Sequence, residues 1–149
     1  VTVVPYTSGP WAGKQIAFSC GGFNGGFNNT GLSILDVTNK NAIQVIKHIS
    51  YPGAAYCHQG WPSKDLKYFY INDELDENGS NFTNTKVIDI QNLSNPVVKQ
   101  AFTNQSTAIG HNLYVEDDRI YEANYTSGLR VFDNTNPLAP VEVAYFDTW

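Results

Sequence analysis

The sequence predicts an all-β fold made of β-propeller-type repeats, and three observations lead to this prediction. Aromatic residues make up 13% of the 149 residues, charged residues make up only 15%, and methionine is absent. No segment keeps a period of 3.6 residues over three turns, as an amphipathic helix would. Short alternating segments bounded by Gly, Asn and Pro recur instead, which is typical of β-strands and their turns.

The repeat is clearest in three segments that align without a gap and end in an aspartate, at residues 31–36, 84–89 and 128–133. The aspartates Asp36, Asp89 and Asp133 lie 53 and 44 residues apart, which is the period of a propeller blade. Each aspartate is followed by a polar turn and another strand. We expect these carboxylates to cap the turns by accepting backbone N–H groups.

Two alternating segments precede each of these repeats, so the predicted unit has four antiparallel strands. Three such blades fill a single domain of residues 1–149, with blade 1 at about 1–50, blade 2 at about 58–103 and blade 3 at about 111–147. Closed propellers use about four to eight blades. We therefore expect an open arc that is either part of a larger propeller or covered through self-association.

Four segments carry a resemblance to a known family: Tyr56-Cys-His-Gln-Gly-Trp61, Asn72-Asp-Glu-Leu-Asp-Glu77, His111-Asn-Leu-Tyr114 and Ala123-Asn-Tyr-Thr-Ser-Gly-Leu-Arg130. In these segments the sequence resembles the LVIVD-repeat proteins and, more narrowly, the choice-of-anchor B family. The resemblance implies a β-propeller and an extracellular or surface location. It also implies a longer parent protein, and it brings no defined catalytic mechanism.

Charge and hydropathy exclude two classes of partner. The net charge is −5, and no basic stripe is present to neutralise nucleic-acid phosphates. No run of about 18 apolar residues occurs, so we expect no membrane span. The chain begins with Val1, which fits a mature processed chain or a fragment.

Six Asn-x-Ser/Thr motifs predict N-linked glycans and therefore secretion. About two would be expected by chance in a chain of this composition. The alternative is simply an Asn-rich protein with many turns. Blade topology puts five of the six at one loop-rich end, with Asn92 alone in an opposite turn. The motifs begin at Asn28, Asn78, Asn81, Asn92, Asn104 and Asn124.

The two cysteines fit an oxidising compartment if they pair. Cys20 ends a predicted strand of blade 1, and Cys57 closes the loop that enters blade 2. Both should therefore lie at the loop-rich end in adjoining blades, where a disulfide is geometrically reasonable. Two free thiols, or one paired with another part of a longer protein, remain the alternatives.

His58 and His111 occupy equivalent positions, at the start of the inner strands of blades 2 and 3. If both rings point toward a shared axial space, they could bind a divalent metal together with Asp73 or Glu74, and we take His58, His111 and Asp73 as the candidate ligands. The alternative is that each histidine hydrogen-bonds a neighbouring blade. The acidic residues 73–80 also suggest calcium, against a default of a solvated loop.

These observations favour an extracellular, N-glycosylated binding or assembly module, a surface or filament component without evident catalysis. No cofactor is expected on this interpretation. The alternative function is a metal-dependent hydrolase or lyase that uses His58 and His111 at the mouth of the propeller channel. That alternative rests on analogy with other propellers.

Overall fold

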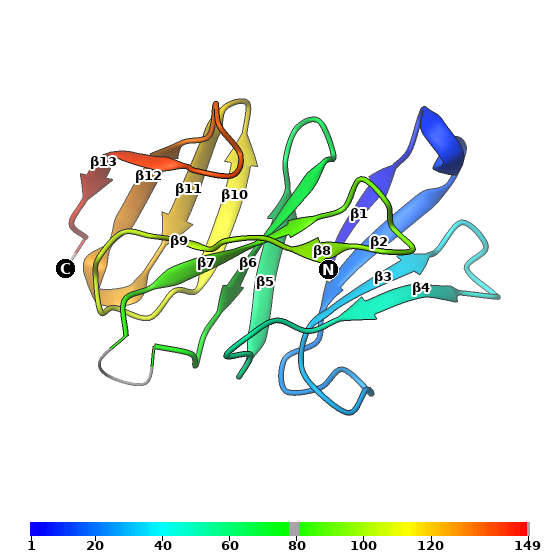
Figure 1. Ribbon diagram of the computed structural model, residues 1–149, viewed down its shortest axis with the longest axis horizontal. Coiled ribbons are helices and arrows are strands. Elements are labelled where there is room, and N and C mark those ends of the chain that lie inside the picture. The colour runs from blue at the N-terminus through cyan, green and yellow to red at the C-terminus, as the bar shows by residue number, and fades with distance from the viewer. Residues whose placement is uncertain (78–80, 149) are drawn as a thin grey trace.

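The computed structural model describes residues 1–77 and 81–148, and it confirms the all-β prediction with three antiparallel sheets arranged side by side (Figure 1). We call the sheets blades 1, 2 and 3. Blade 1 contains β1 (Thr2–Pro5), β2 (Gln15–Cys20), β3 (Leu32–Asp36) and β4 (Gln44–Ile49). Blade 2 contains β5 (Cys57–Pro62), β6 (Tyr68–Asp73), β7 (Asn84–Asp89), β8 (Val97–Val98) and β9 (Phe102–Thr103). Blade 3 contains β10 (Asn112–Glu116), β11 (Arg119–Ala123), β12 (Leu129–Asp133) and β13 (Val141–Phe146). Two short 3₁₀ helices, η1 (Gly9–Trp11) and η2 (Tyr125–Ser127), lie in loops.

The fourth strand of blade 2 is not continuous, unlike the fourth strands of blades 1 and 3. It is divided into β8 and β9, which pair with opposite ends of β7. The register shifts by one residue between these two pairings. The same shift occurs within blade 1, between β3 and β4, and within blade 3, between β12 and β13. A β-bulge at this point bends the outer strand, and in blade 2 the bend separates the strand into two pieces.

The aspartates that end the third strand of each blade cap the following turns, as predicted. Asp36 Oδ1 accepts the N–H of Thr38 at 2.9 Å, and Asp133 Oδ1 accepts the N–H of Thr135 at 2.9 Å. Asp89 Oδ1 accepts the N–H of Gln91 in the same way. Hydrogen bonds to Thr38, together with Lys14, lower the pKa of Asp36 to about 2. The recurring aspartates are therefore structural.

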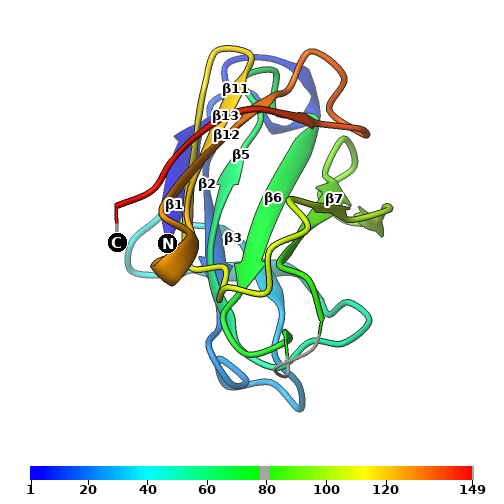
Figure 2. The ribbon, with the colours of Figure 1, turned by 90° about the vertical axis from the view of Figure 1, so that its left-hand side faces the viewer.

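The hydrophobic core consists of two layers, one between each pair of neighbouring blades, and the blades stack face to face when seen from the end of the row (Figure 2). We call the face of a blade that points to the next blade in the chain its forward face, and the opposite face its back face. Between blades 1 and 2, the rings of Phe18 and Phe69 stack with their centroids 4.9 Å apart. Between blades 2 and 3, Tyr70 packs with Ile120 and Phe132.

One register position shows how the arc ends. Phe18, Tyr70 and Tyr121 each lie in the second strand of their blade and point forward. Their cross-strand partners are Ile34, Val87 and Val131, each two residues before the turn aspartate. Phe18 and Tyr70 are fully buried because the next blade covers them, whereas Tyr121 is 37% exposed. The forward face of blade 3 is therefore built like a blade interface, but within residues 1–77 and 81–148 no blade packs on it.

Candidate functional site

Two histidines and one glutamate converge at the loop-rich end, where blade 2 meets blade 3. His58 is the second residue of β5, Glu74 directly follows β6, and His111 directly precedes β10. His58 Nδ1 lies 3.5 Å from Glu74 Oε2, and His111 Nε2 lies 3.7 Å from Glu74 Oε1. One potential ligand atom from each residue lies within 4.8 Å of the others. The arrangement has the composition of a metal-binding triad.

The rings around Glu74 are closely packed. The rings of His58 and His111 stack with centroids 4.1 Å apart and planes inclined by 20°. Tyr125, in η2, meets His111 edge to face and donates its hydroxyl hydrogen to Glu74 Oε1 at 2.5 Å. Burial, followed by the charge of His58, lowers the pKa of His111. A neutral imidazole therefore predominates at His111 at neutral pH.

Next to the cluster, the side chain of Gln59 joins the two inner strands through hydrogen bonds to the backbone of Leu113. The Gln59 amide donates to the carbonyl of Leu113 at 2.9 Å, and its oxygen accepts the Leu113 N–H at 2.8 Å. Gln59 follows His58 directly, and Leu113 lies two residues after His111. These two hydrogen bonds keep His58 and His111 level with each other along the two inner strands.

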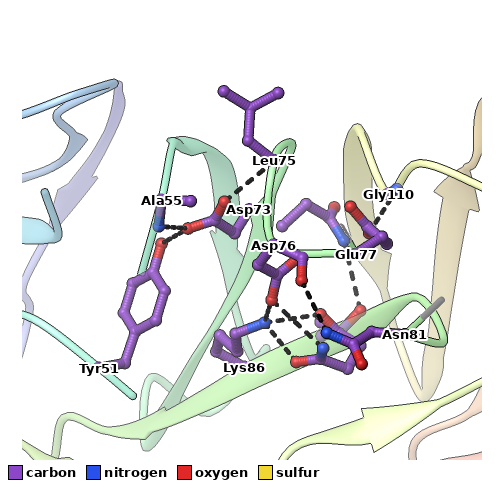
Figure 3. A network of polar contacts seen from close by, with 12 residues as sticks. Tyr51, Ala55, Asp73, Leu75, Asp76, Glu77, Asn81, Lys86 and Gly110 are labelled. Atoms are coloured by element: carbon purple, nitrogen blue, oxygen red, sulfur yellow. Dashed lines mark hydrogen bonds and ion pairs between the residues drawn. The ribbon is translucent and has the colours of Figure 1, made fainter. Parts of the chain in front are cut away.

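The carboxylate between the histidines is Glu74, although the sequence pointed to Asp73 as the third ligand. Asp73 is buried, and both of its oxygens accept hydrogen bonds (Figure 3). Tyr51 Oη donates to Oδ2 at 2.9 Å, and three backbone N–H groups also donate to this carboxylate, those of Ala55, Tyr56 and Leu75. Asp73 thus organises the loop that enters β5, and its lone pairs are already engaged.

In the described part of the acidic segment after Asp73, two of the acidic side chains are buried, which differs from the solvated loop expected by default. Asp76 and Glu77 are buried at 7% and 4% exposure. Lys86 forms an ion pair with Asp76, and Glu77 Oε1 accepts the N–H of Gly110 at 2.9 Å, as Figure 3 shows. Burial raises the pKa of both carboxyl groups. The described part of this segment therefore packs into the junction of blades 2 and 3, because each carboxylate has a buried partner.

The cysteines meet at the corresponding junction of blades 1 and 2. Both are free thiols in this structure, Cys57 fully buried and Cys20 half-buried. A hydrogen bond with Cys57, together with burial, raises the pKa of Cys20. The backbone joins them as well, because Gly22 and Cys57 exchange N–H···O bonds of 2.8 and 3.1 Å. The disulfide itself stays a prediction.

The candidate glycosylation sites differ in how accessible their side-chain amide nitrogens are. Asn28 and Asn92 are exposed. Asn81 is also exposed, but its Nδ2 donates to the carbonyl of Asp76. Asn104 has a buried Nδ2, and Asn124 is fully buried with its Nδ2 bonded to Glu122. A glycan on Asn124 would require that hydrogen bond to break. The sixth site, Asn78, lies outside the described residues.

Comparison with known proteins adds no functional assignment. No family model matches the chain, and no curated protein matches it. The resemblance to LVIVD-repeat proteins therefore stays a prediction. Within residues 1–77 and 81–148, no helix has the length and apolar character needed to cross a membrane.

Proposed function

We propose that this chain is an extracellular structural module that assembles head to tail through the outer faces of blades 1 and 3. The observation that carries the proposal is the exposure of Tyr121 at a position where Phe18 and Tyr70 are fully buried. A repeat protein buries its core only by stacking neighbouring units. Covering Tyr121 with another blade would complete the pattern that the first two junctions follow.

The forward face of blade 3 offers an apolar row across its four strands. Tyr114 is 55% exposed, Tyr121 is 37% exposed, and Val131 is half-buried between them and Ala144. The equivalent row of blade 2 packs on the back face of blade 3, where Val115, Ile120 and Phe132 form the opposing row.

The back face of blade 1 presents the counterpart of that opposing row. Val3, Ala17, Leu35 and Val45 pair across its four strands in the same register. Val3 and Val45 are 52% and 57% exposed. Ala17 itself is only 3% exposed, so Val3 and Val45 would carry the contact with a second copy. A forward face and a back face that differ from each other define a head-to-tail contact, which produces either a closed ring or a filament.

The assembly proposal predicts concentration-dependent association, to be measured by analytical ultracentrifugation between about 1 and 100 μM. Tyr121→Glu and Val3→Glu should each shift the protein to monomer, because each puts a charge in the middle of an apolar contact. Val97→Glu is the matched control: Val97 is 44% exposed but belongs to the central blade. A monomeric parent protein at every concentration would contradict the proposal.

Mixing the two monomeric variants sharpens this test. The Tyr121→Glu variant keeps an intact blade 1 face, and the Val3→Glu variant keeps an intact blade 3 face. Their mixture should therefore form a dimer and nothing larger. Larger species in the mixture would point to a different contact surface.

Secretion and N-glycosylation are part of the same proposal, supported by the six motifs and by the open amides of Asn28 and Asn92. The protein secreted from a glycosylating host should lose mass on treatment with an amidase that removes N-linked glycans. Peptide mapping should then find modified Asn28 and Asn92. An unchanged mass would contradict this part of the proposal.

A second candidate function, divalent-metal binding, is favoured by the His58–Glu74–His111 cluster. It is the binding step that the hydrolase or lyase alternative requires, here with Glu74 in the position expected for Asp73. Elemental analysis after incubation with zinc and dialysis should find about one zinc ion per chain. Protein that retains no zinc would remove both this candidate and the reactions that depend on it.

A further inference from the structure

The His58–Glu74–His111 cluster crosses a boundary between two repeats. His58 and Glu74 belong to blade 2, and His111 belongs to blade 3. Any ion that binds all three side chains would therefore connect the two blades directly. A hydrogen bond that crosses the same boundary, from Tyr125 of blade 3 to Glu74 of blade 2, already closes the cluster on one side.

The donor atoms select the class of ion. Two imidazole nitrogens and one carboxylate oxygen suit zinc and the neighbouring first-row divalent metals better than calcium or magnesium, which prefer oxygen ligands. Zinc bonds of about 2.0–2.1 Å in tetrahedral geometry put neighbouring ligand atoms about 3.3 Å apart. The two histidine–glutamate distances of 3.5 and 3.7 Å, each to a different oxygen of Glu74, are close to that spacing.

We infer that a divalent ion of the zinc class, held by His58, Glu74 and His111, joins blade 2 to blade 3 and stabilises their junction. The inference rests on metal binding at this cluster, the second candidate function above. Beyond binding, the ion would fix the angle between blades 2 and 3 and stabilise their junction. Blade 3 carries the exposed forward face, so the ion also fixes the orientation of that face relative to blade 2.

Binding requires a small rearrangement of the rings. The lone pair of an imidazole nitrogen lies in the ring plane, and two stacked rings cannot both direct lone pairs at one ion. Rotation about the side-chain bonds would unstack His58 from His111. Asn112 Nδ2 lies 2.9 Å from His111 Nδ1. With that amide turned, its oxygen would accept the Nδ1–H and leave Nε2 free for the metal.

The junction between blades 1 and 2 has a corresponding feature at the same end of the molecule. There Cys20 of blade 1 contacts Cys57 of blade 2, one residue before His58. Each junction therefore brings together side chains that could be cross-linked, two thiols at the first and two imidazoles with a carboxylate at the second. A cross-link limits the conformations of the unfolded chain and resists separation of the two blades.

The test measures zinc binding and its effect on the junction in the full chain. Zinc should bind with a stoichiometry of about one, raise the midpoint of thermal unfolding, and slow amide hydrogen exchange in β5 and β10 at least tenfold. His111→Gln and Glu74→Gln should each weaken binding at least tenfold. His48→Gln is the matched control, because His48 lies in β4 of blade 1, away from the cluster.

The outcomes separate the inference from the function on which it rests. No bound zinc in the parent protein removes both. Zinc that binds, is lost in the two cluster variants, and leaves exchange in β10 unchanged keeps metal binding but overturns the joining of the blades. Zinc that binds equally to the cluster variants lies elsewhere and overturns the inference. Circular dichroism of each apo variant verifies that it is folded.

Discussion

Asp73 and Glu74 are neighbours in the chain, yet their carboxylates have different kinds of partners. Asp73 points into the loop that enters β5, where a tyrosine hydroxyl and three backbone N–H groups occupy it. Glu74 points into the boundary between blades 2 and 3, where it meets His58, His111 and Tyr125. Its partners there are side chains and not backbone N–H groups.

A carboxylate can bind a ligand when its oxygens are not already engaged by fixed donors. A carboxylate whose oxygens are already saturated by backbone donors gains little from a metal, since each new bond replaces an existing one. Glu74 receives one short hydrogen bond, and its histidine contacts are 3.5 and 3.7 Å long. It can therefore exchange those contacts for an ion at low cost.

The largest effect is expected from Asp73→Asn, measured by denaturant unfolding at pH 7. An amide of the same shape keeps one acceptor but directs its NH₂ group at backbone N–H donors that need an acceptor. We expect a loss of about 3 kcal/mol of unfolding free energy, because buried donors stay unpaired. A loss below about 1 kcal/mol would show that Asp73 does not organise this loop and would remove the contrast with Glu74.

The blades could be predicted from the sequence because each depends on local alternation and on a repeated aspartate. The predicted strand end at Cys20 coincides with the end of β2, and the turn role of Asp36 follows from its position. The repeat also located His58 and His111 at equivalent strand starts, which brought them together correctly. These features depend on short-range pattern and on the symmetry of the fold.

The identity of the third cluster residue could not be predicted from the pattern. At the end of a strand the alternation of side chains stops, so nothing in the sequence says whether Asp73 or Glu74 faces the histidines. The buried ion pair of Asp76 and Lys86 had one signal: a lysine in the middle of a central strand, β7, needs a partner. The split of β8 from β9 depends on a bulge whose position no residue marks.

A third carboxylate, that of Glu122 in β11, should make the stability of the protein depend on pH. It is fully buried, and burial raises its pKa, although Thr85 and Asn124 donate hydrogen bonds to it. A carboxyl group whose pKa is higher in the folded than in the unfolded chain contributes stability at low pH. That contribution is lost as the pH rises through the folded value.

Glu122→Gln should remove this pH dependence of stability. Above neutral pH it should raise the unfolding free energy by on the order of 1–2 kcal/mol. If the Asn124 amide turns, the new amide can donate to its Oδ1 atom, which is buried and has no partner among the described residues. The measurement is urea unfolding of both proteins at intervals between pH 4 and 8. If the unfolding free energies of the two proteins change with pH in parallel across this range, Glu122 remains ionised in the folded protein.

The smallest effect is expected from Glu74→Gln in metal-free protein, the counterpart of Asp73→Asn in shape and charge change. The new amide oxygen can still accept the Tyr125 hydroxyl, and the side chain has no backbone donor to satisfy. We expect the unfolding free energy at pH 7 to change by less than about 0.5 kcal/mol, measured with a chelator present. A loss as large as that of Asp73→Asn would mean that Glu74 holds the blades together without an ion. The cluster would then be a fixed structural contact, and the difference between the two neighbouring carboxylates would be one of position alone.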